Sequence, residues 1–125
     1  MIRISEAESR VMEALWSKAP LSIDQINRKV GKANGWAPNT VRTLITRLLK
    51  KKAIKGARED DVYCYRPLIA RSAWVQAESK GLLDRLFKGK VTPLVAHFAQ
   101  HRALSEQDIQ ELKELVARLE TDDER

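Results

Sequence analysis

The sequence has few of the features that mark a secreted or membrane-embedded protein. It contains a single cysteine, Cys64, so an internal disulfide is excluded and a reducing compartment is expected. No run approaches the roughly 20 apolar residues that cross a bilayer. Residues 1–6 lead directly into a charged helical pattern, which argues against a signal peptide. We therefore expect a cytoplasmic protein with no membrane insertion.

Sequence motifs that carry catalysis are missing as well. There is no glycine-rich phosphate loop, no nucleophile elbow, no H-E-x-x-H and no close cluster of Asp, Glu and His. Ser5, Ser22 and Ser105 are better explained as helix caps. His97 and His101 lie four residues apart and could hold a metal, but no third ligand is near them in sequence. We expect neither an enzyme nor a cofactor or metal site.

Charge is divided unevenly along the chain. Residues 1–70 carry 14 Lys and Arg against 7 Asp and Glu, whereas residues 71–125 carry 9 against 10. A basic first half beside a near-neutral second half suggests that only the first half meets a polyanion. A basic surface that is merely solvated would have the same composition.

Two short helices are expected at the start. Ser5 and Glu8 form an S-x-x-E capping box ahead of a helix over about 5–17. A second helix begins at Ser22 and is expected to end at Gly31, with a turn over 32–36.

A third helix has the clearest amphipathic pattern in the chain. Pro38 suits its first turn, and apolar residues recur from Val41 to Leu49 at spacings of 0, 3, 4, 7 and 8. Trp36 precedes it, either as a hydrophobic staple or as a contact to DNA. The period then changes to that of two short strands, 54–58 and 62–66, with a polar turn between them.

This order of elements predicts a mainly α fold with a small β wing, a winged helix-turn-helix. The polar face of the third helix offers groups that contact bases and phosphates in a major groove, and the lysines after it extend the basic surface onto the hairpin. An exposed helix face with no partner is the plainer alternative. The predicted contacts to double-stranded DNA are Asn39, Thr40, Arg42, Thr43, Thr46, Arg47, Lys50, Lys51, Lys55 and Arg58. The acidic hairpin turn, 59–61, is expected to stay in solvent.

The second half is expected to be helical over about 70–87, 92–100 and 105–119. The last of these helices has an apolar seam from Ile109 to Leu119 near the 3.5-residue repeat. Such a small unit has too thin a core to be stable alone, so a partner is expected. The predicted domains are therefore 1–69, which binds DNA, and 70–125, a helical region that needs a partner.

The chain also resembles the penicillinase repressor family (BlaI/MecI/CopY-type transcriptional repressors). The resemblance is carried by residues 4–16, 35–52, 87–89, 94–98 and 104–109, and it extends to about residue 119. It implies a dimeric, sequence-specific repressor whose amino-terminal winged helix binds a palindromic operator. The paired Cys-x-Cys motifs of the copper-responsive branch are absent, so metal sensing of that kind is not expected.

The resemblance further implies that residues 70–125 are a helical dimerisation region that makes the protein a homodimer, and it implies a release mechanism. A membrane sensor metalloprotease would trigger cutting in the dimerisation region, and the corresponding bond here joins His97 and Phe98, where known members have Asn in place of His97. The dimerisation residues are expected to be Leu83, Leu86, Phe87, Leu94, Phe98, Ile109, Leu112, Val116 and Leu119.

A different class of function stays open from the residues alone. Winged helices also serve as protein-interaction adaptors that bind no DNA. The seam on the last helix would then pair with another protein instead of its own copy.

Overall fold

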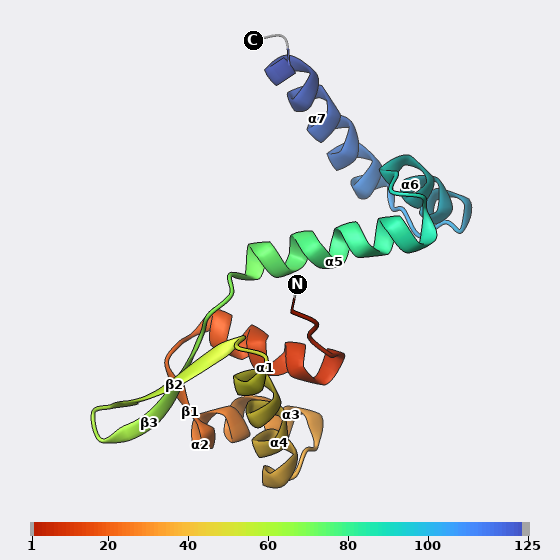
Figure 1. Cartoon of the computed structure of the whole chain (residues 1–125). Coiled ribbons are helices and arrows are strands. Elements are labelled where there is room, and N and C mark those ends of the chain that lie inside the picture. Colours follow the sequence, from red (N-terminus) through yellow and green to blue (C-terminus); the bar gives the residue numbers. More distant parts are fainter. Residues whose placement is uncertain (1, 124–125) are drawn as a thin grey trace. The chain divides into compact units, whose positions relative to one another are not determined.

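The computed structural model describes residues 2–123. It is mainly helical with one small antiparallel sheet, which confirms the expected fold class. The chain divides into two compact units, Met1–Glu78 and Ser79–Arg125, and helix α5 (Arg71–Leu86) contributes to both (Figure 1). The expected division at residue 69 stays a prediction. No described helix is long and apolar enough to cross a membrane.

Helix α1 (Glu6–Ser17) begins at the predicted capping box. The Glu8 amide donates to Ser5 Oγ at 3.1 Å, and the Ser5 amide donates to Glu8 Oε1 at 3.0 Å. These two bonds satisfy backbone donors that the first turn of a helix leaves free.

The second helical segment is longer than the sequence suggested. It runs through α2 (Ile23–Ile26), a π-helical turn η1 (Asn27–Gly31) and α3 (Lys32–Asn34) without a break. The expectation of an end at Gly31 was therefore wrong.

Gly31 has a packing role instead of a terminating one. A Cβ there would lie 3.2 Å from Val41 Cγ2, so the missing side chain lets this segment approach α4 closely. Gly35 ends the segment, with the left-handed φ of +68° that glycine adopts most readily.

Helix α4 (Pro38–Lys50) matches the prediction for the third helix. Pro38 occupies its first turn, and Val41, Leu44, Ile45 and Leu48 are buried. Trp36 is half-buried and packs against the same core, as a hydrophobic staple would.

The sheet has three strands in the order β1–β3–β2. Strands β2 (Ile54–Glu59) and β3 (Val62–Pro67) form the predicted hairpin, and Asp60 and Asp61 both take positive φ in its two-residue turn. Strand β1 (Leu21–Ser22) was not predicted, because two residues are too short for an alternating pattern.

The first turns of α5 pack onto α1. The rings of Trp16 and Trp74 lie 5.4 Å apart, and Trp16 Nε1 donates to the Ile69 carbonyl at 2.9 Å. On the surface beside them, Arg71 pairs with Glu13 at 3.0 Å. The amino-terminal unit therefore includes the start of α5 as well as the winged helix.

The second unit contains the end of α5, α6 (Val91–Gln100) and α7 (Glu106–Asp123). Ser105 and Asp108 cap α7 reciprocally, as expected, but the helix continues past the predicted end at residue 119. Among residues 79–122, none is buried. This part of the second unit therefore has no core of its own.

Candidate nucleic-acid interface

Helix α4 presents one polar face to solvent. All seven predicted contacts on it are exposed, while its opposite face supplies part of the core. They are Asn39, Thr40, Arg42, Thr43, Thr46, Arg47 and Lys50.

These side chains have a definite order around the helix. With about 100° of rotation per residue, Asn39, Thr43, Thr46 and Lys50 fall within about 60° of one another, on the side opposite the core. Arg42 lies on one flank of this crest and Arg47 on the other. A single helix of this kind matches the width of a major groove.

Two threonines on the crest have their hydroxyl hydrogens engaged. Thr43 Oγ1 donates to the Asn39 carbonyl and Thr46 Oγ1 to the Arg42 carbonyl, both at 2.9 Å. Each threonine can then offer a base only its methyl group and an acceptor lone pair. This chemistry suits the methyl group of thymine better than an acceptor on a purine or a phosphate.

The start of α4 favours an anion. No acidic residue lies in its first turn, and Ala37 caps it without a side-chain hydrogen bond. The positive end of the helix dipole therefore faces outward beside Asn39, although the Thr40 and Val41 amides already donate to the Ala37 carbonyl.

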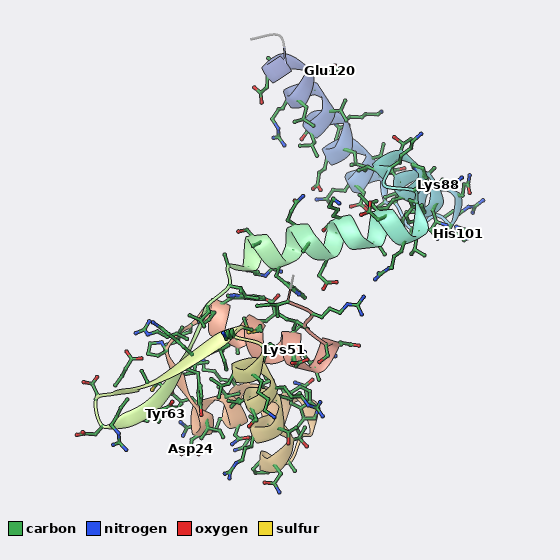
Figure 2. All side chains as sticks on the ribbon, viewed as in Figure 1. Asp24, Lys51, Tyr63, Lys88, His101 and Glu120 are labelled. Carbon is green, nitrogen blue, oxygen red and sulfur yellow. The ribbon has the colours of Figure 1, made fainter. Side chains whose placement is uncertain are left out.

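Lys51 differs from the other predicted cations. Its Nζ lies 2.6 Å from Glu8 Oε1, and Glu8 is only 2% exposed (Figure 2 labels Lys51). Burial raises the pKa of Glu8, but hydrogen bonds from Lys51 and Ser5 outweigh it, so the pKa lies below 4.5. Lys51 thus serves an internal ion pair, whereas Lys50 is free to meet a ligand.

The hairpin has two chemically different faces. Strand alternation and register place Ile54, Gly56, Arg58, Tyr63, Tyr65 and Pro67 on one, the tyrosine face. The other, the cysteine face, carries Lys55, Ala57, Glu59, Val62, Cys64 and Arg66.

Lys55 and Arg58, predicted together as DNA contacts, lie on opposite faces. On the cysteine face, Arg66 pairs with Glu59 at 2.8 Å, which lowers the pKa of Glu59, and Lys55 adds a smaller effect in the same direction. Arg58 is exposed on the tyrosine face, which carries no acidic residue.

Tyr63 on the tyrosine face was not singled out from the sequence. Its side chain is half exposed, and Figure 2 labels it on the hairpin. Strand alternation alone could have placed it beside Arg58, since the two residues are cross-strand partners.

The predicted dimerisation residues all lie in the second unit, with apolar surface in solvent. Leu83, Phe87, Leu94 and Leu112 are half-buried. The other five are exposed: Leu86, Phe98, Ile109, Val116 and Leu119. Leu104, Ile109, Leu112 and Val116 also line a shallow apolar groove along α7.

The predicted cleavage site lies in the middle of α6. His97 and Phe98 are both exposed, and the His97 ring lies 4.4 Å from that of His101. Within residues 2–123, no group of three His, Cys, Asp or Glu side chains is arranged to hold a metal ion.

The sequence matches one family model over nearly its whole length. Residues 4–118 match the model described as "Penicillinase repressor". The chain is 30% identical to the penicillinase repressor of Bacillus licheniformis over 114 residues, which is 91% of this chain and 89% of the relative. It is 34% identical over 113 residues to the methicillin resistance regulatory protein MecI of Mammaliicoccus sciuri, covering 90% and 92%.

A solved structure resembles part of the chain. It is the solution structure of monomeric Bacillus licheniformis BlaI in complex with the blaP half-operator, with a TM-score of 0.53 and 33% identity. The match covers 58% of this chain and 89% of that one.

Proposed function

The chain belongs to the penicillinase repressor family, and from this membership we propose that it represses transcription by binding a palindromic DNA operator as a homodimer. The solved relative that binds a half-operator supports duplex DNA as the partner. The relatives of this chain are named as repressors and regulators, in line with the expectation that the chain is not an enzyme. Repression of this kind places its action in the cytoplasm, where the DNA is.

The exposed polar face of α4 is the observation that carries this proposal. A helix that buries four apolar residues and leaves Asn39, Arg42 and Thr43 in solvent can enter a groove without losing core contacts. Arg42 can bridge guanine O6 and N7, and Asn39 can pair with adenine. Lys50 and Arg58 add contacts to phosphates that position the protein without reading bases.

The exposed apolar surface of the second unit supports a homodimer. Its apolar side chains Leu86, Phe98 and Leu119 are between 43% and 64% exposed. A two-fold partner would bury such a surface and hold two α4 helices about 34 Å apart, one turn of DNA. Two weak half-sites would then bind as one strong site.

The first experiment is selection of bound sequences from a random pool of duplex DNA, followed by gel-shift titration of the recovered duplex. Arg42→Ala and Arg47→Ala should each lose roughly 1–3 kcal/mol of specific binding. Lys18→Ala, which removes an exposed cation after α1, is the control and should bind normally. Unchanged affinity in both arginine variants would show that α4 does not read the DNA sequence.

Salt dependence and oligomeric state complete the test. With 6–10 phosphate contacts per dimer, affinity should fall about 10³–10⁵-fold between 50 and 200 mM salt. Light scattering should give the mass of a dimer. A monomer that binds no duplex would overturn the proposal in favour of an interaction adaptor.

Release by proteolysis is the proposed route of induction, with a membrane sensor metalloprotease as its trigger. The His97–Phe98 bond is accessible at its side chains but lies within α6, so that helix must unwind locally before cutting. Mass spectrometry of the chain from induced cells should find a fragment beginning at Phe98. An intact chain in cells where repression has been lifted would exclude this route.

A further inference from the structure

The tyrosine face of the hairpin contains a steric arrangement that DNA binding by α4 does not require. Gly56 lies in the middle of β2 with ordinary strand backbone, so no unusual φ calls for glycine there. A glycine inside a strand weakens the strand, because glycine loses more backbone entropy on folding than other residues and has no side chain to pack. Some other feature must therefore offset that cost.

That feature is the ring of Tyr63. A Cβ on Gly56 would lie 2.5 Å from Tyr63 Cε1 and 2.6 Å from its hydroxyl oxygen, closer than two such atoms can approach. The Tyr63 side chain thus lies across the glycine and occupies the space where any other residue would place its side chain. The ring lies against strand β2 at the glycine, although half of the Tyr63 side chain is in solvent.

A second ring connects Tyr63 to α4. Tyr65 meets Tyr63 edge-on, with centroids 5.5 Å apart and planes at 76°. Burial and the neighbouring Tyr63 raise the pKa of Tyr65, and the positive charge of Arg42 opposes them. The tyrosine face therefore continues from Arg58 through the two rings toward Arg42.

We propose that Tyr63 is a DNA-backbone contact, with its ring fixed on Gly56 and its hydroxyl donating to a phosphate beside the groove that α4 enters. This inference rests on the proposed function. Tyrosine hydroxyls are among the groups that donate to DNA phosphates. A ring that already lies against the strand in the free protein has less conformational freedom to lose on binding. Arg42 and Arg58 at either end of the face supply the charge that attracts the backbone.

The test measures affinity for a half-site duplex recovered by the selection described above. Tyr63→Phe removes only the hydroxyl and should weaken binding about tenfold, the effect of one hydrogen bond to a charged group. The slope of affinity against salt should not change, because a neutral hydroxyl releases no counterions. Arg58→Ala should instead reduce that slope by about one.

Gly56→Ala tests the position of the ring. It should also weaken binding about tenfold, and the double variant with Tyr63→Phe should be no worse than either single change. Val62→Ala is the matched control, since Val62 is 49% exposed against 50% for Tyr63 but points to the cysteine face. Thermal unfolding checks that the Gly56→Ala variant is folded. If that variant does not fold, Tyr63→Phe alone still tests whether Tyr63 contacts DNA.

The outcomes separate this inference from the proposed function. If the wild-type chain binds no duplex, the proposed function fails. If the wild type binds and Tyr63→Phe binds equally well at every salt concentration, Tyr63 makes no contact and the inference is overturned. Additive losses in the double variant would overturn the role of Gly56.

Discussion

The Nζ atom of Lys51, directly after helix α4, lies 2.6 Å from Oε1 of Glu8 in the first turn of α1. The two residues lie 43 positions apart in the sequence. The pair holds the end of α4 against α1, while the Glu8 side chain also completes the capping box of Ser5. Glu8 is buried and its Oε2 has no hydrogen-bond partner, so Lys51 provides most of the compensation for its charge.

Replacing Glu8 by Gln should destabilise the protein. Glutamine can keep the capping box, so the change isolates the charge. We expect a loss of about 1–3 kcal/mol at neutral pH, because a buried interaction with Lys51 is removed. Chemical denaturation measures it. Glu6→Gln, on the exposed side of the same turn, is the control and should leave stability nearly unchanged.

The same pair predicts a dependence on pH. The folded-state pKa of Glu8 is below its ordinary value of 4.5, so its contribution to stability is complete above that value. The contribution disappears as the pH falls through the folded-state pKa. The difference between wild type and Glu8→Gln should therefore narrow in acid. A constant difference from neutral pH down to strong acid would show that the charge of Glu8 is not the cause.

Thr43 should recognise thymine through its methyl group. Thr43→Val keeps a methyl in the same place and should retain most of the affinity, whereas Thr43→Ser keeps the hydroxyl and should lose about 1 kcal/mol. Deoxyuridine in place of the contacted thymine should weaken DNA binding by the wild type by the same amount and leave DNA binding by Thr43→Ser unchanged. If valine rather than serine abolishes binding, the hydroxyl makes the contact.

The apolar seam of α7 should hold the dimer together. Val116→Lys places a charge on an exposed apolar position and should shift the chain toward monomer, as sedimentation measures. Gln110→Lys places the same charge on an exposed position of α7 outside the groove, so it is the control and should remain dimeric. The variant should bind a single half-site as the wild type does but lose the gain from a full palindrome. A dimeric Val116→Lys protein would place the contact elsewhere.

Two glycines should respond in opposite ways to the same substitution. No atom lies within 4 Å of a Cβ built on either Gly35 or Gly81. Gly81 lies inside α5 with ordinary helical backbone, so alanine should stabilise the protein by about 1 kcal/mol. Gly35 has φ of +68°, and alanine there should destabilise it by about the same amount or more. Thermal unfolding compares them. Destabilisation by Gly81→Ala would mean that a partner subunit closely approaches that position.

Local patterns predicted most of the helices and the hairpin. Helix α4 has an apolar face, a proline in its first turn and a basic end, and these three signals agree. The segment after Gly31 was mispredicted because a glycine that makes room for Val41 looks the same in sequence as one that ends a helix. Strand β1 exists only through its pairing with Tyr65 and Cys64, which no local pattern reveals.

The candidate site was predictable in outline but not in detail. The exposed face of α4 follows from helical periodicity. The pairing of Lys51 with Glu8 depends on how α1 packs against the end of α4. The sequence alone therefore could not show that Lys51, unlike the lysines on either side of it, is held in an ion pair. Lys55 and Arg58 were predicted together, although strand alternation could have placed them on opposite faces; with the hairpin register it would also have identified Tyr63.

No side chain of residues 79–122 is buried, and this has a consequence for how repression depends on the amount of the protein. With the proposed pairing, occupancy of the operator at low abundance grows with the square of the number of chains, by mass action. Halving synthesis would then cut occupancy about fourfold. A cell could thus silence or release the regulated genes through modest changes in how much of this protein it makes.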